Sequence, residues 1–546
     1  MSSDVELPDW LARVAGEAAL LLVAPHGGRR ARASALELDD PRKVNDLHTA
    51  ELTFELAARL RARAIVNRSE DRNRLDLNRV SDVRDRAPWL VDLLLDDTRH
   101  QLATAGHATV LFIHGWNAIQ PCCDVGIGAR LAGGSFVPVR QGVPTVPASF
   151  LPRLARFAGV CHAGGIAVTV GDRYPAAGRE NVLQMFTARY ADDPDPRIRE
   201  LARLGAAGMI TAVQLELAVP LRWPGPLRAT LFEAMQTFAE VGTRTDGHPI
   251  LTGLDAPSAQ PTAAERLAVE FHDGNAGVGG FAATERLISG RRHGRLLLCI
   301  GAKRLSLFTG EDSSFCDAST KLGSALRCAG LAWTRGEGGE VRLEFDGPCL
   351  IFLRTDPFLD LEDGLADAEL SQLQASLVWR PVADGARLGR IDGRVRYDGW
   401  SASVSAPAAL EQGHAAETQP WRERRVLRVP LGPDTFLSIA SRVDREEHIE
   451  GEIVREGRVE PLLSGRVSVR NCADGLAPDA WRIEAVSRSG TLRVFGQVSH
   501  AIPVVRPAAA GKVLTHFGLA RFGDGERVGF GTFEQSQRLR QKGTQR

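Results

Sequence analysis

The chain has 546 residues, of which 44% are hydrophobic and 25% are charged, and this is the composition of an ordinary globular protein. Its length exceeds what one hydrophobic core supports, so we expect more than one domain. The 67 Lys and Arg residues balance the 67 Asp and Glu residues, and this neutrality gives no indication of binding to nucleic acid or to an anionic membrane.

The sequence contains neither a signal-peptide pattern at its start nor an apolar stretch long enough to span a membrane. Its 8 cysteines are scattered and none forms a C-x-x-C pair, which favours reduced thiols over a disulfide framework or a zinc ribbon. We therefore expect a cytoplasmic protein without a membrane span. The pattern leaves the oligomeric state open.

The first 242 residues alternate between short apolar runs and helical patterns. Leucines recur every four residues over 49–63, and a similar apolar spacing follows two prolines near 226–238, so both segments are predicted helices. Near-continuous apolar strands separated by helices indicate an α/β domain whose mostly parallel mixed sheet has helices on both faces. The predicted strands are 19–24, 63–67, 109–113, 166–170 and 209–219.

The composition and the hydrophobic pattern of the sequence change after this domain. Residues 243–280 are rich in turn-forming residues and are predicted to be a linker with one short helical piece, Thr262–Phe271. Residues 281–540 contain many short strands that alternate apolar with charged residues, which is typical of an all-β sandwich or barrel. The last residues, 541–546, are polar and are expected to be a disordered tail.

Two histidines follow apolar strands and precede glycines. These are His26, before Gly27 and Gly28, and His114, before Gly115. Ligands of open α/β sheets bind beyond the carboxyl ends of strands, and imidazole is the commonest metal ligand, so the two histidines are candidate metal ligands. A structural role as hydrogen-bonding residues is the alternative.

A carboxylate is expected to complete this metal site. Glu51 at the start of the predicted helix is the favoured third ligand, although a glutamate there also suits the helix dipole. His48 and Asp46 remain alternatives for the same role.

Two further groups of polar residues are candidates for substrate binding and catalysis. Arg72 precedes the run from Asp76 to Arg79, and arginines beside Asn78 suit recognition of a substrate carboxylate, unless the run is only a solvated surface. Gln214 and Glu216 are two residues apart in a strand and lie on one side of it. Glu216 is a candidate general base, with a salt bridge as the alternative.

Taken together, these residues resemble the N-formylglutamate amidohydrolase family, relatives of the zinc carboxypeptidases, over about residues 17–240. The matching pieces occur in the family's order and are Pro25–Gly28, the helix begun by Glu51, Arg72 with Asp76–Arg79, His114–Gly115, Asp124–Gly128 and Val213–Glu216. Two features depart from the pattern, because Phe112 occupies the position of an expected acidic residue and Trp116–Asn117 is an unusual continuation.

The resemblance implies a zinc-peptidase-like fold and a zinc ion on His26, Glu51 and His114. It implies that Glu216 is the catalytic base, while Arg72 acts on the substrate carbonyl or carboxylate. The residues expected to bind substrate are Asn78, Arg79 and Gln214. The expected reaction is cleavage of an amide bond in an N-acyl or γ-linked amino acid, or in a peptide-like molecule that carries a carboxylate.

The C-terminal half resembles lipocalin-like domains of the carotenoid-hydratase type, through the runs Val498–His500 and Gly529–Ser536. His500, His516 and Glu534 are candidates for a second polar site there. An alternative function for the whole chain is motivated by Phe112 in place of the expected acidic residue and by the open choice of the third ligand. In this alternative the α/β domain is a catalytically silent scaffold, and the β domain holds an apolar small molecule in a barrel.

Overall fold

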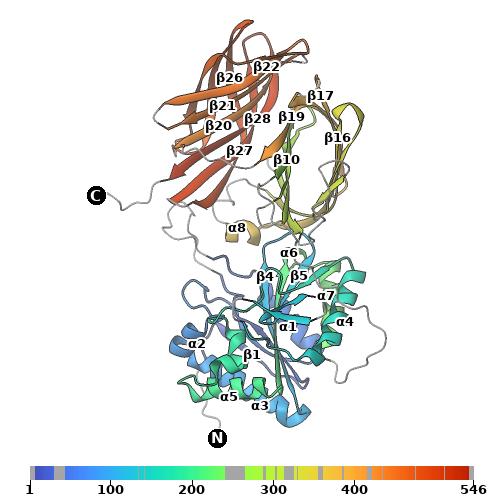
Figure 1. Cartoon of the computed structure of the whole chain (residues 1–546), viewed down its shortest axis with the longest axis vertical. Coiled ribbons are helices and arrows are strands. Elements are labelled where there is room, and N and C mark those ends of the chain that lie inside the picture. Colours follow the sequence, from blue (N-terminus) through green and yellow to red (C-terminus); the bar gives the residue numbers. More distant parts are fainter. Residues whose placement is uncertain are drawn as a thin grey trace, which may run out of the picture. The chain divides into compact units, whose positions relative to one another are not determined.

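A computed structural model gives the fold of the chain as two compact units (Figure 1). The first unit lies within residues 7–239 and the second within residues 265–539. The structure describes residues 7–29, 43–132, 135–139, 142–239, 265–286, 291–301, 304–312, 325–328, 330–353, 361–383, 386–414, 421–432, 434–444, 446–473, 475–508 and 511–539.

The first unit is built on a seven-stranded sheet with the order β1-β3-β2-β4-β9-β5-β8. The strand β2 is parallel to β3 and β4, β4 is parallel to β9, and β5 is parallel to β8, whereas β1 and β5 are antiparallel to β3 and β9. The sheet is therefore mixed and mostly parallel, as predicted. Its strands are β1 (Leu11–Val14), β2 (Leu20–Ala24), β3 (Arg63–Asn67), β4 (Ala108–Trp116), β5 (Cys122–Gly126), β8 (Ala167–Val170) and β9 (Ile210–Ala218).

Helices cover both faces of this sheet (Figure 1). One face packs against α1 (Thr49–Leu60), α4 (Leu151–Ala163) and α7 (Pro226–Ala239). The other face packs against α2 (Val80–Arg86), α3 (Pro88–Ala105) and α5 (Pro196–Ala206). The predicted α/β fold is thus confirmed. The short elements are β6 (Ala129–Ala132), β7 (Ser135–Pro138) and α6 (Val219–Arg222).

Strand alternation decides which side chains reach the functional edge of the sheet. On β4, Leu111 and Ile113 enter the core under α1, α4 and α7, whereas Val110 and Phe112 enter the opposite core. Successive side chains of a strand point to opposite faces, so His114 projects to the face of Phe112. On β9 the same parity places Gln214 and Glu216 on that face.

The second unit contains a ten-stranded antiparallel sheet with the order β13-β12-β11-β10-β19-β18-β17-β16-β15-β14. An additional pairing of β13 with β16 closes the sheet into a barrel. The strands are β10 (Glu265–Asp273), β11 (Val278–Arg286), β12 (Arg292–Ile300), β13 (Arg304–Asp312), β14 (Ala325–Cys328), β15 (Leu331–Arg335), β16 (Val341–Phe352), β17 (Glu369–Pro381), β18 (Leu388–Tyr397) and β19 (Trp400–His414), and α8 (Leu361–Ala366) lies between β16 and β17 in the chain.

The same unit contains a nine-stranded antiparallel sheet with the order β23-β22-β21-β20-β28-β27-β26-β25-β24. The hydrophobic core on one face of this sheet includes Leu427, Ile439, Trp481 and Phe533. The strands are β20 (Glu423–Pro430), β21 (Thr435–Val443), β22 (Glu447–Arg455), β23 (Arg458–Pro461), β24 (Ser464–Asn471), β25 (Pro478–Ser487), β26 (Gly490–Ala508), β27 (Gly511–Gly523) and β28 (Val528–Leu539). The prediction of an all-β second half is confirmed.

One local prediction is wrong. Residues expected to form a helical piece over 262–271 form strand β10 instead, from Glu265 onward. Pairing with β19, far along the chain, overrides the local helical spacing. The strands β10 and β11 therefore occupy the later part of the predicted linker, while its earlier part and the predicted tail lie outside the described residues.

No helix in the described part of the chain is long and apolar enough to cross a membrane.

Candidate metal centre

Two parallel neighbouring strands bring His26 and His114 together. The strands β2 and β4 end at the same edge of the sheet; His26 follows β2 and His114 lies near the end of β4. The two imidazole rings meet edge to face, with their centroids 4.8 Å apart. Both side chains are buried. The structure therefore places the two predicted metal ligands side by side.

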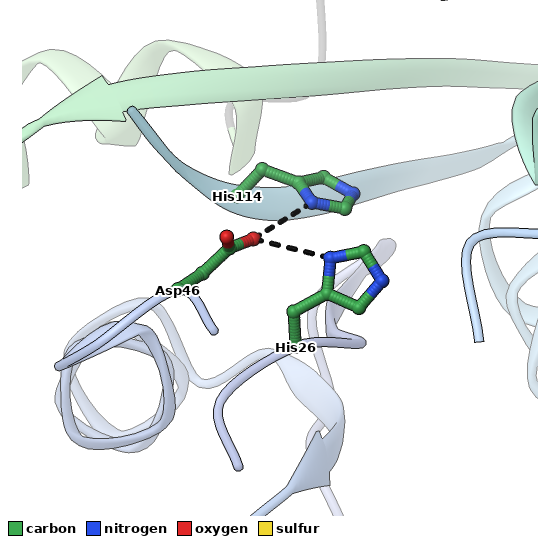
Figure 2. A group of neighbouring side chains, drawn as sticks. All are labelled: His26, Asp46 and His114. Carbon is green, nitrogen blue, oxygen red and sulfur yellow. Dashed lines mark hydrogen bonds and ion pairs between the residues drawn. The ribbon is translucent and has the colours of Figure 1, made fainter. Parts of the chain in front are cut away.

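The carboxylate between the two rings belongs to Asp46 (Figure 2). Its Oδ2 lies 3.0 Å from Nδ1 of His114 and 3.3 Å from Nδ1 of His26. One ligand atom from each of the three buried residues lies within 4.8 Å of the others. The backbone fixes Asp46, because its N–H donates to the carbonyl of His26 and its carbonyl accepts from the hydroxyl of Thr49.

The glycine that follows each histidine is required by close packing. A Cβ atom on Gly27 would lie 2.5 Å from the carbonyl oxygen of Asn67. A Cβ on Gly115 would lie 2.5 Å from Nη1 of Arg222 and 3.0 Å from Cβ of Asp46. Only glycine therefore allows the backbone to approach the group this closely.

Charged residues surround the three ligands. Arg72 donates from Nη1 to Oδ1 of Asp46 at 3.1 Å, so the second carboxylate oxygen, Oδ2, is the one that faces the histidines. Oδ1 of Asp76 lies 2.7 Å from Nε2 of His26. A carboxylate that accepts from the far nitrogen of a ligating histidine fixes the tautomer of that histidine. A metal held by His26 and Asp46 would therefore take Nδ1 of His26, the nitrogen that lies 3.3 Å from Oδ2 of Asp46, while Nε2 donates to Asp76.

The electrostatics of both aspartates follow from these contacts. Burial alone would raise the pKa of Asp46, but hydrogen bonds from His114 and His26 and the charge of Arg72 hold that pKa well below its ordinary value. Burial likewise acts to raise the pKa of Asp76, and its hydrogen bond with His26 and the nearby charges of Arg72 and Lys43 lower it. Both carboxylates are therefore anionic at neutral pH.

Glu216 lies on the strand beside the group. Register pairs it with His114 on β4, and period-2 alternation puts both side chains on the same face. Its Oε1 accepts from Nε2 of Gln214 at 2.7 Å, and Oε1 of Gln214 in turn accepts from Asn181. Burial raises the pKa of Glu216 to about 7, against the lowering effect of His114. A carboxyl group with that pKa can exchange protons at neutral pH.

Asp124, part of the matching run 124–128, has a structural role on the other side of Glu216. It is the register partner of Glu216 on β5. Its carboxylate accepts from the hydroxyl of Thr169 and from the backbone N–H groups of residues 172–174, at 2.6 to 3.2 Å. The buried carboxylate thereby fixes the turn after β8, and Tyr174 in this turn packs edge-on against Trp116 at the end of β4.

Several predicted site residues do not join the group. Glu51 is exposed on α1, whose inward face carries Leu52 and Leu56, so the helix turns Glu51 away from the sheet edge. His48 packs against Trp223 instead. The structure thus favours Asp46 over Glu51 and His48 as the third ligand, which corrects the preferred assignment.

The predicted arginine fork is not formed. Arg72 is held by Asp46, but Arg79 is exposed and contacts Ser81 and Glu180. Asn78 lies closer to the site, since its backbone N–H donates to Oδ1 of Asp76. The Oδ1 of Asn78 is buried without a hydrogen-bond partner in the described part of the chain.

The donor set fits a divalent metal ion such as zinc. Catalytic zinc sites use three protein ligands from histidine and carboxylate side chains and keep a further position for water or substrate. The group of His26, Asp46 and His114 supplies two imidazoles and one carboxylate, and Asp76 supports one of the imidazoles. The buried Nε2 of His114 has no hydrogen-bond partner among the described residues.

Comparisons with known proteins find only remote similarity. No family model matches the sequence, and no curated protein does. Among solved structures, a candidate AttH from Nitrosomonas europaea is 13% identical with a TM-score of 0.35, covering 55% of this chain and 100% of its own. Kievitone hydratase from Nectria haematococca is 10% identical with a TM-score of 0.29, covering 52% and 91%. N-formylglutamate amidohydrolase from Ralstonia eutropha is 14% identical with a TM-score of 0.28, covering 42% and 94%.

These likenesses are too remote to assign an activity. A function for this chain can be inferred only from its own side chains.

Proposed function

We propose that the first unit is a zinc-dependent amidohydrolase. It would cleave an amide bond in an N-acyl or γ-linked amino acid, or in a peptide-like molecule that carries a carboxylate. The observation that carries the proposal is the buried group of His26, Asp46 and His114, whose ligand atoms lie within 4.8 Å of one another. A buried carboxylate between two imidazoles is costly to maintain unless it serves a bound cation or a fixed ion pair.

A zinc ion bound by these residues would lower the pKa of a water molecule to about 7 and polarise the amide carbonyl. Glu216 would accept the proton of that water and then pass it to the leaving amine. Its Oε1 is engaged by Gln214, so Oε2 is the atom that takes the proton. Gln214 is thus a positioning residue in this proposal, rather than a substrate ligand.

The proposal gives Arg72 and Asn78 separate roles. Arg72 binds Oδ1 of Asp46 and therefore maintains the ligand charge and orientation. Asn78 presents a buried amide oxygen without a partner in the described chain, and an N–H group of the substrate amide would satisfy it. Arg79 has no part in the mechanism, because its side chain is exposed and bound to Ser81.

The experiment that tests this function is a hydrolysis screen with zinc-loaded full-length protein. The substrates are N-formyl, N-acetyl and γ-glutamyl amino acids, and the released amine is measured. We expect turnover of at least one class, and a loss of about 100-fold or more in kcat for Glu216→Gln with zinc content unchanged. Glu55→Gln is the control, since Glu55 is half-exposed on α1. Full activity of Glu216→Gln would reject the role of Glu216, and no turnover of any class would reject the hydrolase proposal.

A further inference from the structure

The second unit contains a cavity of about 940 Å³ between its two sheets. Strands β10, β11, β12 and β19 of the closed barrel contribute to one wall, and strands β20, β21, β22, β27 and β28 contribute to the other. The lining residues of this cavity all belong to the second unit. The cavity therefore raises the question of what the β half binds.

Strand register explains why the cavity is polar. On β20, Leu427 and Val429 enter the core of the nine-stranded sheet, so Arg424, Val426 and Arg428 project from its other face into the cavity. The neighbouring strands β21 and β28 repeat the pattern, because Ile439 and Phe533 face the core. The adjacent residues Ser438, Ala440 and Glu534 line the cavity. The charged face of the nine-stranded sheet therefore lines the cavity between the two sheets, although its sequence pattern is that of a solvent-exposed face.

Ion pairs cross and border this cavity. Glu411 accepts from Arg428 at 2.6 Å and also pairs with Arg266 at 3.3 Å. Glu534 accepts from Arg424 at 2.8 Å. In total the lining contains six arginines and five glutamates, and their charges nearly cancel. Because the signs are mixed, a strongly charged ligand of either sign would meet repulsion as well as attraction.

Small side chains, among them Val426, Ser438 and Ala440, line the part of the wall that strands β20 and β21 form. Val426 and Ala440 are directly opposite each other on β20 and β21, and Arg428 is opposite Ser438. Aromatic rings lie at another part of the wall, where Phe281 and Phe517 stack on each other with centroids 5.8 Å apart, and the guanidinium of Arg266 lies 5.4 Å from the centroid of the Phe281 ring. The cavity therefore combines open space, donors and acceptors in alternation, and apolar ring faces.

We infer that this cavity binds an uncharged polyhydroxylated molecule, a short oligosaccharide. A hydroxyl group both donates and accepts, so it can hydrogen-bond to guanidinium and carboxylate groups that lie side by side. The ring faces of a saccharide are apolar and can pack on an aromatic side chain of the wall such as Phe517. An apolar ligand would bury the paired charges without replacing their contacts with water, which costs free energy.

The test uses the full-length chain on a glycan microarray, followed by calorimetry with the best-bound glycan. We expect a defined set of oligosaccharides to bind, and we expect Ala440→Phe, which adds a ring to the cavity lining, to weaken binding of the best glycan at least tenfold. Ser401→Phe is the control, because it adds the same ring at an exposed position of β19. Arg442→Gln keeps the cavity open and removes one donor, so it should weaken binding without abolishing it.

Three results would overturn the inference. The first is that no glycan binds above background. The second is that Ala440→Phe and Ser401→Phe bind the best glycan as tightly as the wild type, which would place binding elsewhere. The third is that citrate, used as an anionic probe, binds and is lost in Ala440→Phe while no glycan binds, which would make this an anion site.

Discussion

Oδ1 of Asp76 lies 2.7 Å from Nε2 of His26, whereas Oδ2 of Asp46 lies 3.3 Å from Nδ1, the other nitrogen of the same ring. The contact with Asp76 would orient His26 as a metal ligand in the proposed centre, because Nε2 of the ring is committed to a carboxylate. Asp76 is in turn fixed by Lys43 and by the backbone N–H of Asn78. The outer carboxylate is thus as much a part of the candidate centre as its three ligands.

Replacing Asp76 should therefore weaken metal binding without removing a ligand. We expect Asp76→Asn to lower zinc affinity by about 10- to 100-fold, since the imidazole of His26 loses its charged partner. Competition with a fluorescent zinc chelator measures the change. Asp92→Asn serves as control, because Asp92 forms a partly exposed ion pair with Arg197 on the helical layer. An affinity for Asp76→Asn equal to that of the control would contradict this role.

Gly115 should tolerate no side chain. A Cβ there would lie 2.5 Å from Nη1 of Arg222, which also donates to the carbonyl oxygen of Leu47. We expect Gly115→Ala to lower the melting temperature and to lose zinc. Gly159→Ala provides the contrast, because nothing lies within 4 Å of a Cβ at that position of α4 and alanine favours a helix. Calorimetry of both variants measures the melting temperatures. An unchanged melting temperature for Gly115→Ala would contradict the prediction that this position requires glycine.

Glu216 should make the stability of the metal-free protein depend on pH. Burial raises its pKa from 4.5 to about 7, so the folded state favours the protonated carboxyl and stability is lost as the pH rises from about 4.5 to 7. The glutamine side chain in Glu216→Gln cannot ionise, so this variant avoids the loss of folding stability, which amounts to at most about 3 kcal/mol. In chelator-treated protein we expect the variant to gain stability over the wild type at pH 8 but not at pH 4.5. Denaturant unfolding at both pH values checks this, and an equal difference at both would refute it.

Much of the fold could be predicted because the signals are local. The buried run at β2 and the leucine spacing of α1 each specify one element, and both elements form where expected. By contrast, β5 was missed, because Cys122–Gly126 is short and carries a buried Asp124 whose partners come from the distant turn after β8. Strand β10 was mistaken for a helix because its pairing partner, β19, is remote in sequence.

For the candidate site, too, some residues could be predicted from local sequence patterns and others could not. His26 and His114 could be found from their strand ends, whereas Asp46 lies in a loop with no periodic pattern and reaches the site through a backbone bond to His26. Glu51 was favoured because its position at a helix start is visible in sequence, but the inward face of that helix is set by Leu52 and Leu56. Asp76 was visible within the arginine-rich run, yet its contact with His26 depends on how the loop after β3 folds back.

Strand register also shows that two candidates for a polar site in the C-terminal half, His516 and Glu534, lie on different faces of their sheet. His516 is opposite Gln535 and Phe517 is opposite Glu534, so the side chains of His516 and Glu534 point to opposite faces of the sheet. They cannot share one site, which corrects that hypothesis. Glu534 instead pairs with Arg424 in the lining of the cavity between the two sheets.

The measurement that tests the account most directly is the zinc content of the purified full-length chain after zinc is offered and excess is removed. We expect about one zinc per chain for the wild type and for Glu51→Gln, and none for Asp46→Asn or His114→Ala. His100→Ala, on the exposed surface of α3, should bind like the wild type. A wild type without zinc, or zinc retained in Asp46→Asn and lost in Glu51→Gln, would contradict the metal centre described for His26, Asp46 and His114.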